Sequence, residues 1–202
     1  MMELSKRYFT AKIVQSEYAK ILFQYLFLTL ISILAGAFLA KYASLSLLCE
    51  RAVRHFALPF QHCTSFREVT VEFFRYSLSD LICTTLLLFF SFSFLNCFCS
   101  NLILGYQGLR FGLLIAANFS LRNFGYAGER WLLFFLRLGI TLCFVFYAYR
   151  LSRYSYEIRK TIFSGRPSLS LKDIVFFLRT SLALLGTIVL FNILYCGIIF
   201  FI

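Results

Sequence analysis

The chain has 202 residues, of which 60% are hydrophobic and only 14% are charged; its formal net charge is +11 and its mean hydropathy is +0.80. Soluble domains carry about a quarter charged residues, so a water-soluble core cannot accommodate this much apolar surface. The composition therefore excludes a soluble globular domain and predicts an integral membrane protein. At roughly 20 residues per span, the length allows about four to six helices in a single membrane domain.

The chain opens with a basic segment, residues 1–20, which mixes Lys6, Arg7 and Lys12 with aromatic and aliphatic side chains. Such a mixture is typical of a helix lying in the membrane interface, and a plain cytoplasmic tail is the alternative. Residues 21–40 contain no charge and are long enough to cross a hydrocarbon core of roughly 30 Å, which predicts the first span. We expect this span to stay uncleaved, because its apolar run is longer than the roughly 7–15 residues of a signal peptide.

Residues 41–77 are predicted to form an outer loop. It contains Cys49 and Cys63, and their spacing alone does not decide whether they form a disulfide. Ser65 and Glu68 have the spacing of a helix capping box, so we expect a helix that begins at Ser65 and leads into the second span.

A charge-free stretch between Asp80 and Arg110 is too long for one helix. The Asn, Cys and Ser residues of 96–101 interrupt it with side chains that favour turns. This pattern predicts a hairpin of two spans, at about 78–97 and 102–120.

Two further spans are predicted at about 131–149 and 174–200, joined by a basic loop, 150–173. Six Lys and Arg residues lie between 150 and 172 against Glu157 alone, which places this loop in the cytoplasm. Five spans then put the N-terminus in the cytoplasm and the C-terminus outside. The sequence thus predicts an all-α integral membrane protein of about five transmembrane helices.

Two arginines lie where charge is costly. Arg110 falls near the middle of the third span and Arg137 about two turns into the fourth, which makes each a functional or packing residue that needs a partner. Asp80, at the start of the second span, is one candidate partner. The alternatives are that Arg137 extends to the outer headgroups and that Arg110 marks a misplaced span boundary.

Several function classes find no support in the residues. The positive charges flank the spans, so we expect the lipid bilayer, and no nucleic acid, as their partner. The acidic residues near spans, Asp80, Glu129 and Asp173, lie at span ends, and no His reaches a span. No zinc-type spacing or phosphate-binding loop occurs. We therefore expect a protein without catalytic residues, metal or cofactor.

Gly108 and Gly112 lie four residues apart in the third span, a pattern that allows another helix to approach closely. With these glycines and the aromatic residues before the second span, the stretch from Phe73 to Ala117 resembles the central hairpin of the stage II sporulation protein M family. Gln107 stands where that family usually has Lys, and Arg110 is an additional charge. The turn at 95–100 also lacks the Gly and Pro of the family.

The resemblance implies a multi-pass protein of the bacterial cell membrane with five spans. It further implies a non-catalytic scaffold that positions peptidoglycan-degrading partners during endospore engulfment. The alternative is the membrane subunit of a small-solute or ABC-type transporter, in which Arg110 faces an anionic substrate and the basic stretch 150–172 docks an ATPase.

Overall fold

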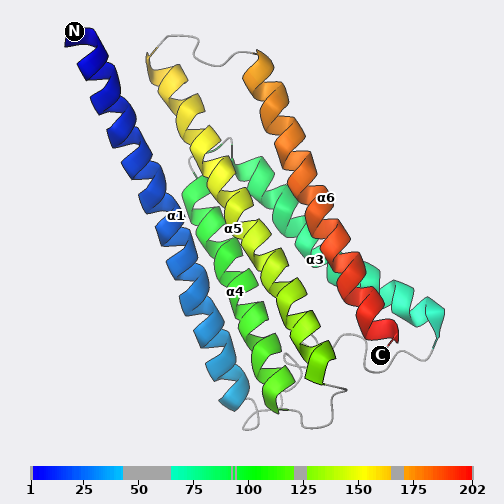
Figure 1. The fold of residues 1–202 in the computed structure, drawn as a ribbon. Coiled ribbons are helices and arrows are strands. Elements are labelled where there is room, and N and C mark those ends of the chain that lie inside the picture. Colours follow the sequence, from blue (N-terminus) through cyan, green and yellow to red (C-terminus); the bar gives the residue numbers. More distant parts are fainter. Residues whose placement is uncertain are drawn as a thin grey trace.

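The computed structural model describes residues 2–42, 65–91, 93, 95–120, 127–164 and 171–201. All regular structure in these residues is helical (Figure 1). The described helices, with the labels of Figure 1, are α1 (Met2–Tyr42), α3 (Phe66–Phe90), α4 (Asn96–Ser120), α5 (Ala127–Ser164) and α6 (Leu171–Phe201).

Helix α4 runs alongside α1 and α5, α6 runs alongside α5, and α3 crosses this row obliquely (Figure 1). Helix α4 packs against α1 on one side and α5 on the other, and α5 also packs against α6. The N-terminal end of α1 and the C-terminal end of α6 lie at opposite ends of this bundle (Figure 1).

Three helices contain stretches that are long and apolar enough to cross a membrane: Tyr18–Ala40 in α1, Phe134–Arg159 in α5 and Val175–Leu194 in α6. Helix α3 has a shorter apolar stretch, Ser77–Phe90. For the described residues, the predicted all-helical architecture with membrane-compatible helices is confirmed.

Apolar side chains of this bundle face outward. Phe23, Phe27 and Leu34 on α1 are each more than half exposed, and α3, α5 and α6 also expose large apolar residues. Asp80 and Arg137, in contrast, are fully buried. This distribution is the reverse of that in a soluble helical bundle, where charged residues are almost never fully buried.

The turn between α3 and α4 lies before the predicted position. Residues 96–101 form the first turns of α4 rather than a turn between helices. Serines close the turn instead: the Ser91 amide donates to the Leu87 carbonyl at 3.0 Å, and the Ser93 hydroxyl accepts from the Leu95 amide at 3.1 Å. Asn96, which we expected in the turn, is buried in α4 and hydrogen-bonds within the bundle.

The basic stretch predicted as a cytoplasmic loop is largely helical. Helix α5 continues to Ser164, and α6 begins at Leu171. The stretch is amphipathic, which explains the helix: Leu151 and Tyr154 are buried, whereas Arg153 and Glu157 are on the exposed side and pair at 3.4 Å, one turn apart. The charges mark a helix surface here, which a count of charged residues does not distinguish from a loop.

Residues 2–20, predicted as a separate interfacial segment, belong to α1 and continue the axis of the first span (Figure 1).

The predicted helix start at Ser65 is confirmed. The Ser65 hydroxyl accepts from the Glu68 amide, and the Glu68 carboxylate accepts from the Ser65 amide, both at 3.3 Å. Cys49 and Cys63 lie outside the described residues.

Candidate functional site

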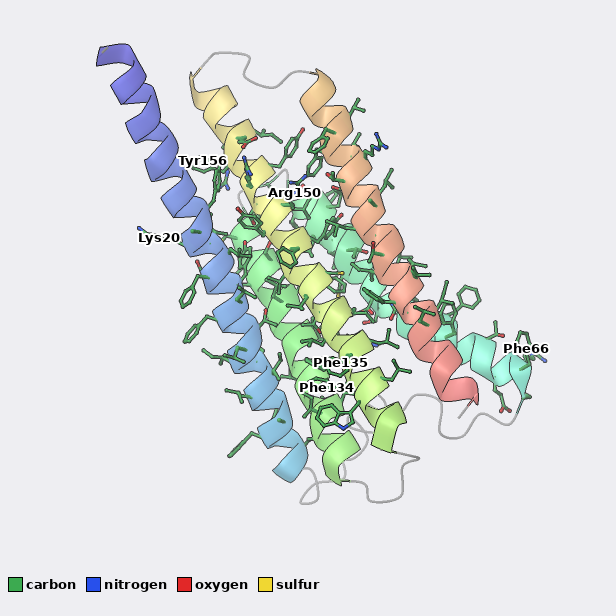
Figure 2. All side chains as sticks on the ribbon, viewed as in Figure 1. Lys20, Phe66, Phe134, Phe135, Arg150 and Tyr156 are labelled. Carbon is green, nitrogen blue, oxygen red and sulfur yellow. The ribbon has the colours of Figure 1, made fainter. Side chains whose placement is uncertain are left out.

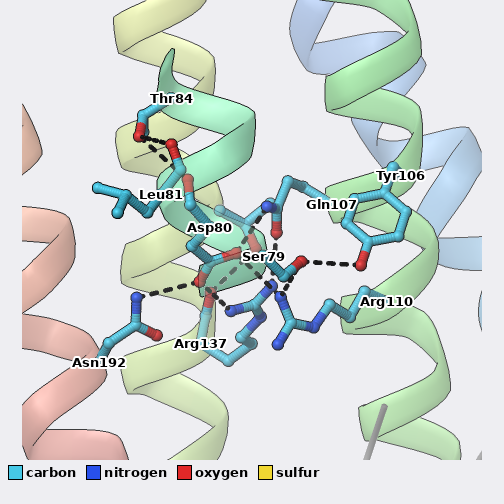
Figure 3. Close-up of polar contacts among 10 residues, drawn as sticks. Ser79, Asp80, Leu81, Thr84, Tyr106, Gln107, Arg110, Arg137 and Asn192 are labelled. Atoms are coloured by element: carbon cyan, nitrogen blue, oxygen red, sulfur yellow. Dashed lines mark hydrogen bonds and ion pairs between the residues drawn. The ribbon is translucent and has the colours of Figure 1, made fainter. Parts of the chain in front are cut away.

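Asp80, on α3, is the centre of a buried polar cluster that joins four helices (Figure 3). Its Oδ1 accepts hydrogen bonds from Gln107 Nε2 at 2.8 Å and Arg110 Nη1 at 2.9 Å, both on α4. Its Oδ2 accepts from Arg137 Nη1 on α5 and Asn192 Nδ2 on α6, each at 3.1 Å. We call these five residues the Asp80 cluster. All four contacts to the carboxyl group are donors, as an ionised carboxylate requires.

Members of the cluster also contact one another. Gln107 links the carboxylate to a guanidinium group, because its amide nitrogen donates to Asp80 while its Oε1 accepts from Arg137 Nη2. Arg110 Nη1 also donates to the Ser79 hydroxyl at 3.4 Å, which in turn shares a hydrogen bond with the Tyr106 hydroxyl at 3.0 Å (Figure 3). The contacts therefore form a connected network rather than separate pairs.

Local helix geometry explains how these side chains meet. Gln107 and Arg110 are three residues apart, so both project from the same face of α4. The oblique path of α3 brings Asp80 close to α4, α5 and α6 (Figures 1 and 3). Asn192 is buried on α6, whose neighbouring side chains Ile193 and Leu194 point outward.

The cluster lies near the middle of the apolar span of α1. Gly108, adjacent to Gln107, contacts α1 at Thr29 and Ser32, which are central in the span from Tyr18 to Ala40. A single charge at such a position is costly in hydrocarbon. Here two guanidinium groups and two amides compensate the carboxylate through charge-assisted hydrogen bonds.

Both arginines named from the sequence are brought to Asp80. Arg110 is 3% exposed and Arg137 is 0% exposed, and each forms an ion pair with this carboxylate. The side chain of Arg137 therefore turns into the bundle rather than toward an outer surface. Arg110 is a helical residue in the interior of α4 rather than at its boundary.

The two glycines named from the sequence lie at the contact between α4 and α1. A Cβ atom at Gly108 would come within 2.7 Å of the Thr29 carbonyl oxygen, and one at Gly112 would overlap the Ile33 carbonyl. From the other side, a Cβ at Gly36 would overlap the Leu109 carbonyl. This small-residue face is therefore occupied by a helix of the same chain.

A second, uncharged polar layer lies toward the N-terminal end of the α1 span. The Tyr25 hydroxyl is 2.6 Å from the Ser152 hydroxyl, which also accepts from Asn96 Nδ2 at 3.1 Å. Ser100 donates to Asn96 Oδ1 at 3.2 Å. These bonds join α1, α4 and α5, so together with the Asp80 cluster they connect every described helix.

Two members of the Asp80 cluster were not predicted as site residues. Gln107 appeared only as a departure from a family pattern, and Asn192 was not considered. A signal was present, because Asn192 is the only amide or charged side chain after Arg179. Strongly polar residues in otherwise apolar spans point to the interior of a bundle even when they carry no charge.

The cysteines differ in their distance from this site. Cys83 is buried near it, whereas Cys97 is exposed at the start of α4. Among the residues that the structure describes, no three His, Cys, Asp or Glu side chains lie close enough together to hold a metal ion.

Comparison with protein-family models, with curated protein sequences and with solved structures found no match.

Proposed function

We propose that the chain crosses the membrane five times, with α3 and α4 joining the three apolar helices, the N-terminus in the cytoplasm and the C-terminus outside. The reversed polarity of the bundle supports this arrangement, since Phe and Leu side chains face outward and charged ones face inward. The only charged residue of α4, Arg110, is paired with Asp80. Helix α4 and the apolar stretch Ser77–Phe90 of α3 can then lie in lipid without exposing a charge.

The function that we propose is that of a non-catalytic scaffold in a bacterial cell membrane. It positions peptidoglycan-degrading partners during endospore engulfment, as the resemblance to the stage II sporulation protein M family implies. The observation that carries the proposal is the Asp80 cluster, because it fastens α3, α4, α5 and α6 to one another through a single carboxylate. A bundle fixed in this way suits a protein that holds partners at set positions.

Two departures from the family pattern are related in space. Gln107 replaces the usual Lys and Arg110 is an additional charge, yet both contact Oδ1 of Asp80. The positive charge missing at one position is thus supplied one turn later on the same face of α4.

The transporter alternative needs Arg110 to face a substrate or a water-filled path. In the structure Arg110 is 3% exposed and its guanidinium group is bonded to Asp80 and Ser79, which favours the scaffold. The Gly108 and Gly112 face is already filled by α1, so we assign partner binding to the segment between α1 and α3 and to outward helix faces.

Crosslinked affinity purification of the tagged chain from its native membrane tests the proposal. A tagged, unrelated multi-span protein from the same membrane serves as the control for nonspecific capture. We expect peptidoglycan hydrolases to be enriched with this chain alone. An ATPase or a solute-binding protein in their place would contradict the scaffold and favour the transporter.

A further inference from the structure

One end of the bundle gathers basic side chains from three helices. We call Lys20 (α1), Arg150 and Arg153 (α5) and Arg179 (α6) the basic collar. Figure 2 shows Lys20 and Arg150 toward the same end of the bundle, with Phe134 and Phe135 toward the other. Contacts between helices fix this common level: the Arg153 guanidinium lies 4.9 Å from the ring centroid of Tyr18, and that of Arg150 lies 5.6 Å from the ring centroid of Phe176.

The collar lies inside the apolar spans, at a level close to the ends of the spans of α1 and α6. The spans begin at Tyr18 in α1 and at Val175 in α6, and the span of α5 ends at Arg159. Long basic side chains at this depth keep their stems against apolar surface and place their charges at the level of the lipid phosphates. The collar is thus positioned for the membrane surface rather than for the aqueous phase beyond it.

Arg150 and Arg179 form the part of the collar best suited to bind a phosphate. Arg150 crosses from α5 to α6, where it stacks on Phe176 and donates from Nη2 to the Thr180 hydroxyl at 3.4 Å. Arg179 precedes Thr180 in the sequence and is exposed. Arg153 differs, because it pairs with Glu157 at 3.4 Å.

The surroundings of Arg150 combine charge with apolar surface. Phe176 is 61% exposed and Val175 is also exposed, so both present apolar area beside the guanidinium group. A guanidinium group has five N–H donors and binds two oxygens of a phosphate at once, and the Thr180 contact uses one of the donors of Arg150. A phospholipid offers both matching parts, a phosphate and an acyl chain.

We propose that an anionic phospholipid binds between α5 and α6, with its phosphate on Arg150 and Arg179 and an acyl chain along Phe176. The lipid must carry a net negative charge, because the described collar has four basic side chains. Within it, Glu157 neutralises Arg153 alone. The inference rests on the membrane location under Proposed function and is independent of the scaffold role.

Thermal unfolding of the full-length chain in detergent micelles tests the site. Phosphatidylglycerol, phosphatidylcholine and inorganic phosphate are titrated separately into the wild type, the double variant Arg150→Gln/Arg179→Gln and the control Arg67→Gln. Arg67 is an exposed basic residue in the first turn of α3, next to Phe66, which Figure 2 shows well away from Lys20 and Arg150. We expect phosphatidylglycerol to raise the unfolding midpoint of the wild type and of the control by several degrees, and the double variant to lose most of this shift.

Equal stabilisation by phosphatidylcholine, or an equal phosphatidylglycerol shift in all three proteins, would overturn the proposal. Stabilisation by inorganic phosphate to the same extent would show that the site binds free phosphate instead of lipid. If the double variant does not fold, Arg179→Gln alone provides the test, because its side chain is exposed; retention of the full shift in that variant would overturn the site. Failure to capture peptidoglycan hydrolases would leave these outcomes unchanged.

Discussion

Asp80 accepts hydrogen bonds from three helices other than its own, and two of its four partners are arginines. Burying a charge is tolerated only when the remaining charges and lone pairs are satisfied. Removal of the carboxylate therefore affects more than one contact, because Arg110 and Arg137 both lose their ion pair with it. Removal of Arg110 or of Arg137 likewise takes one ion pair from Asp80.

Asp80→Asn keeps the shape of the side chain and removes its charge. We expect a loss of about 3–5 kcal/mol in the free energy of unfolding, the usual result of removing one partner from a buried charge pair. Denaturant titration of the purified chain in micelles measures it. Glu157→Gln is the matched control, since it removes a pair in which both side chains are about half exposed, and we expect it to cost less than about 1 kcal/mol.

Replacement of Asp80, Arg110 and Arg137 together by Leu distinguishes charge pairing from packing. Buried ion pairs are often replaced by apolar residues without loss, so we expect the triple variant to be more stable than Asp80→Asn. If Asp80→Asn and Glu157→Gln destabilise the chain equally, the cluster does not hold the bundle together.

The positions of Arg110 and Arg137 within predicted apolar spans were enough to identify them from the sequence, with Asp80 as their candidate partner. A charge inside a long apolar run is conspicuous in any single sequence. Gln107 and Asn192 are less conspicuous because an amide costs less in hydrocarbon than a charge and is tolerated at many places in a span. Their convergence on one carboxylate depends on how α3 crosses the other helices, which periodicity does not reveal.

At the level of helices, the contact between α1 and α4 depends on small residues. Gly36, Gly108 and Gly112 bring the two backbones so close that a side chain at any of them would meet a carbonyl oxygen. Gly186 on α6 differs, because an added Cβ there would have no neighbour within 4 Å. Gly186 can therefore serve as a control position for substitutions at the three glycines of the α1–α4 contact.

Gly112→Ala is expected to destabilise the chain by about 1–3 kcal/mol, because α1 has to move away from α4 to admit the methyl group. Gly186→Ala is expected to be neutral or slightly stabilising, since Ala is the better helix former. Unfolding titrations of both variants under the same conditions make the comparison. Similar stability in Gly112→Ala and Gly186→Ala would show that the close approach of α1 is not required.

Helix ends were harder to predict than helix existence. The capping box at Ser65 located the start of α3, because its two hydrogen bonds are local and depend on residues three apart. The start of α4 at Asn96 was missed because the Asn side chain bonds to Ser152 on α5, which is 56 residues later in the sequence. The extension of α5 to Ser164 was missed for a related reason, as its buried face packs against other helices.

At the level of the whole molecule, the distribution of polar and apolar side chains is the reverse of that in a soluble protein. Charged and amide side chains meet in the interior of the bundle, Phe and Leu side chains cover its outside, and the four residues of the basic collar lie at one level toward one end. A membrane location accounts for the first two features, because lipid can cover the apolar surface and the buried Asp80 pairs with two arginines inside the bundle. In the proposed orientation, the basic collar faces the cytoplasmic leaflet. The proposed scaffold and lipid site both depend on this placement.

Topology mapping tests the proposed orientation and the odd number of spans most directly. A phosphatase that is active only outside the cytoplasm is fused in turn before Met1 and after Ile202, and its activity is measured in intact cells at matched expression. Five spans with a cytoplasmic N-terminus predict activity for the fusion after Ile202 and none for the fusion before Met1. Activity at both ends or at neither would mean an even number of spans and would contradict the account.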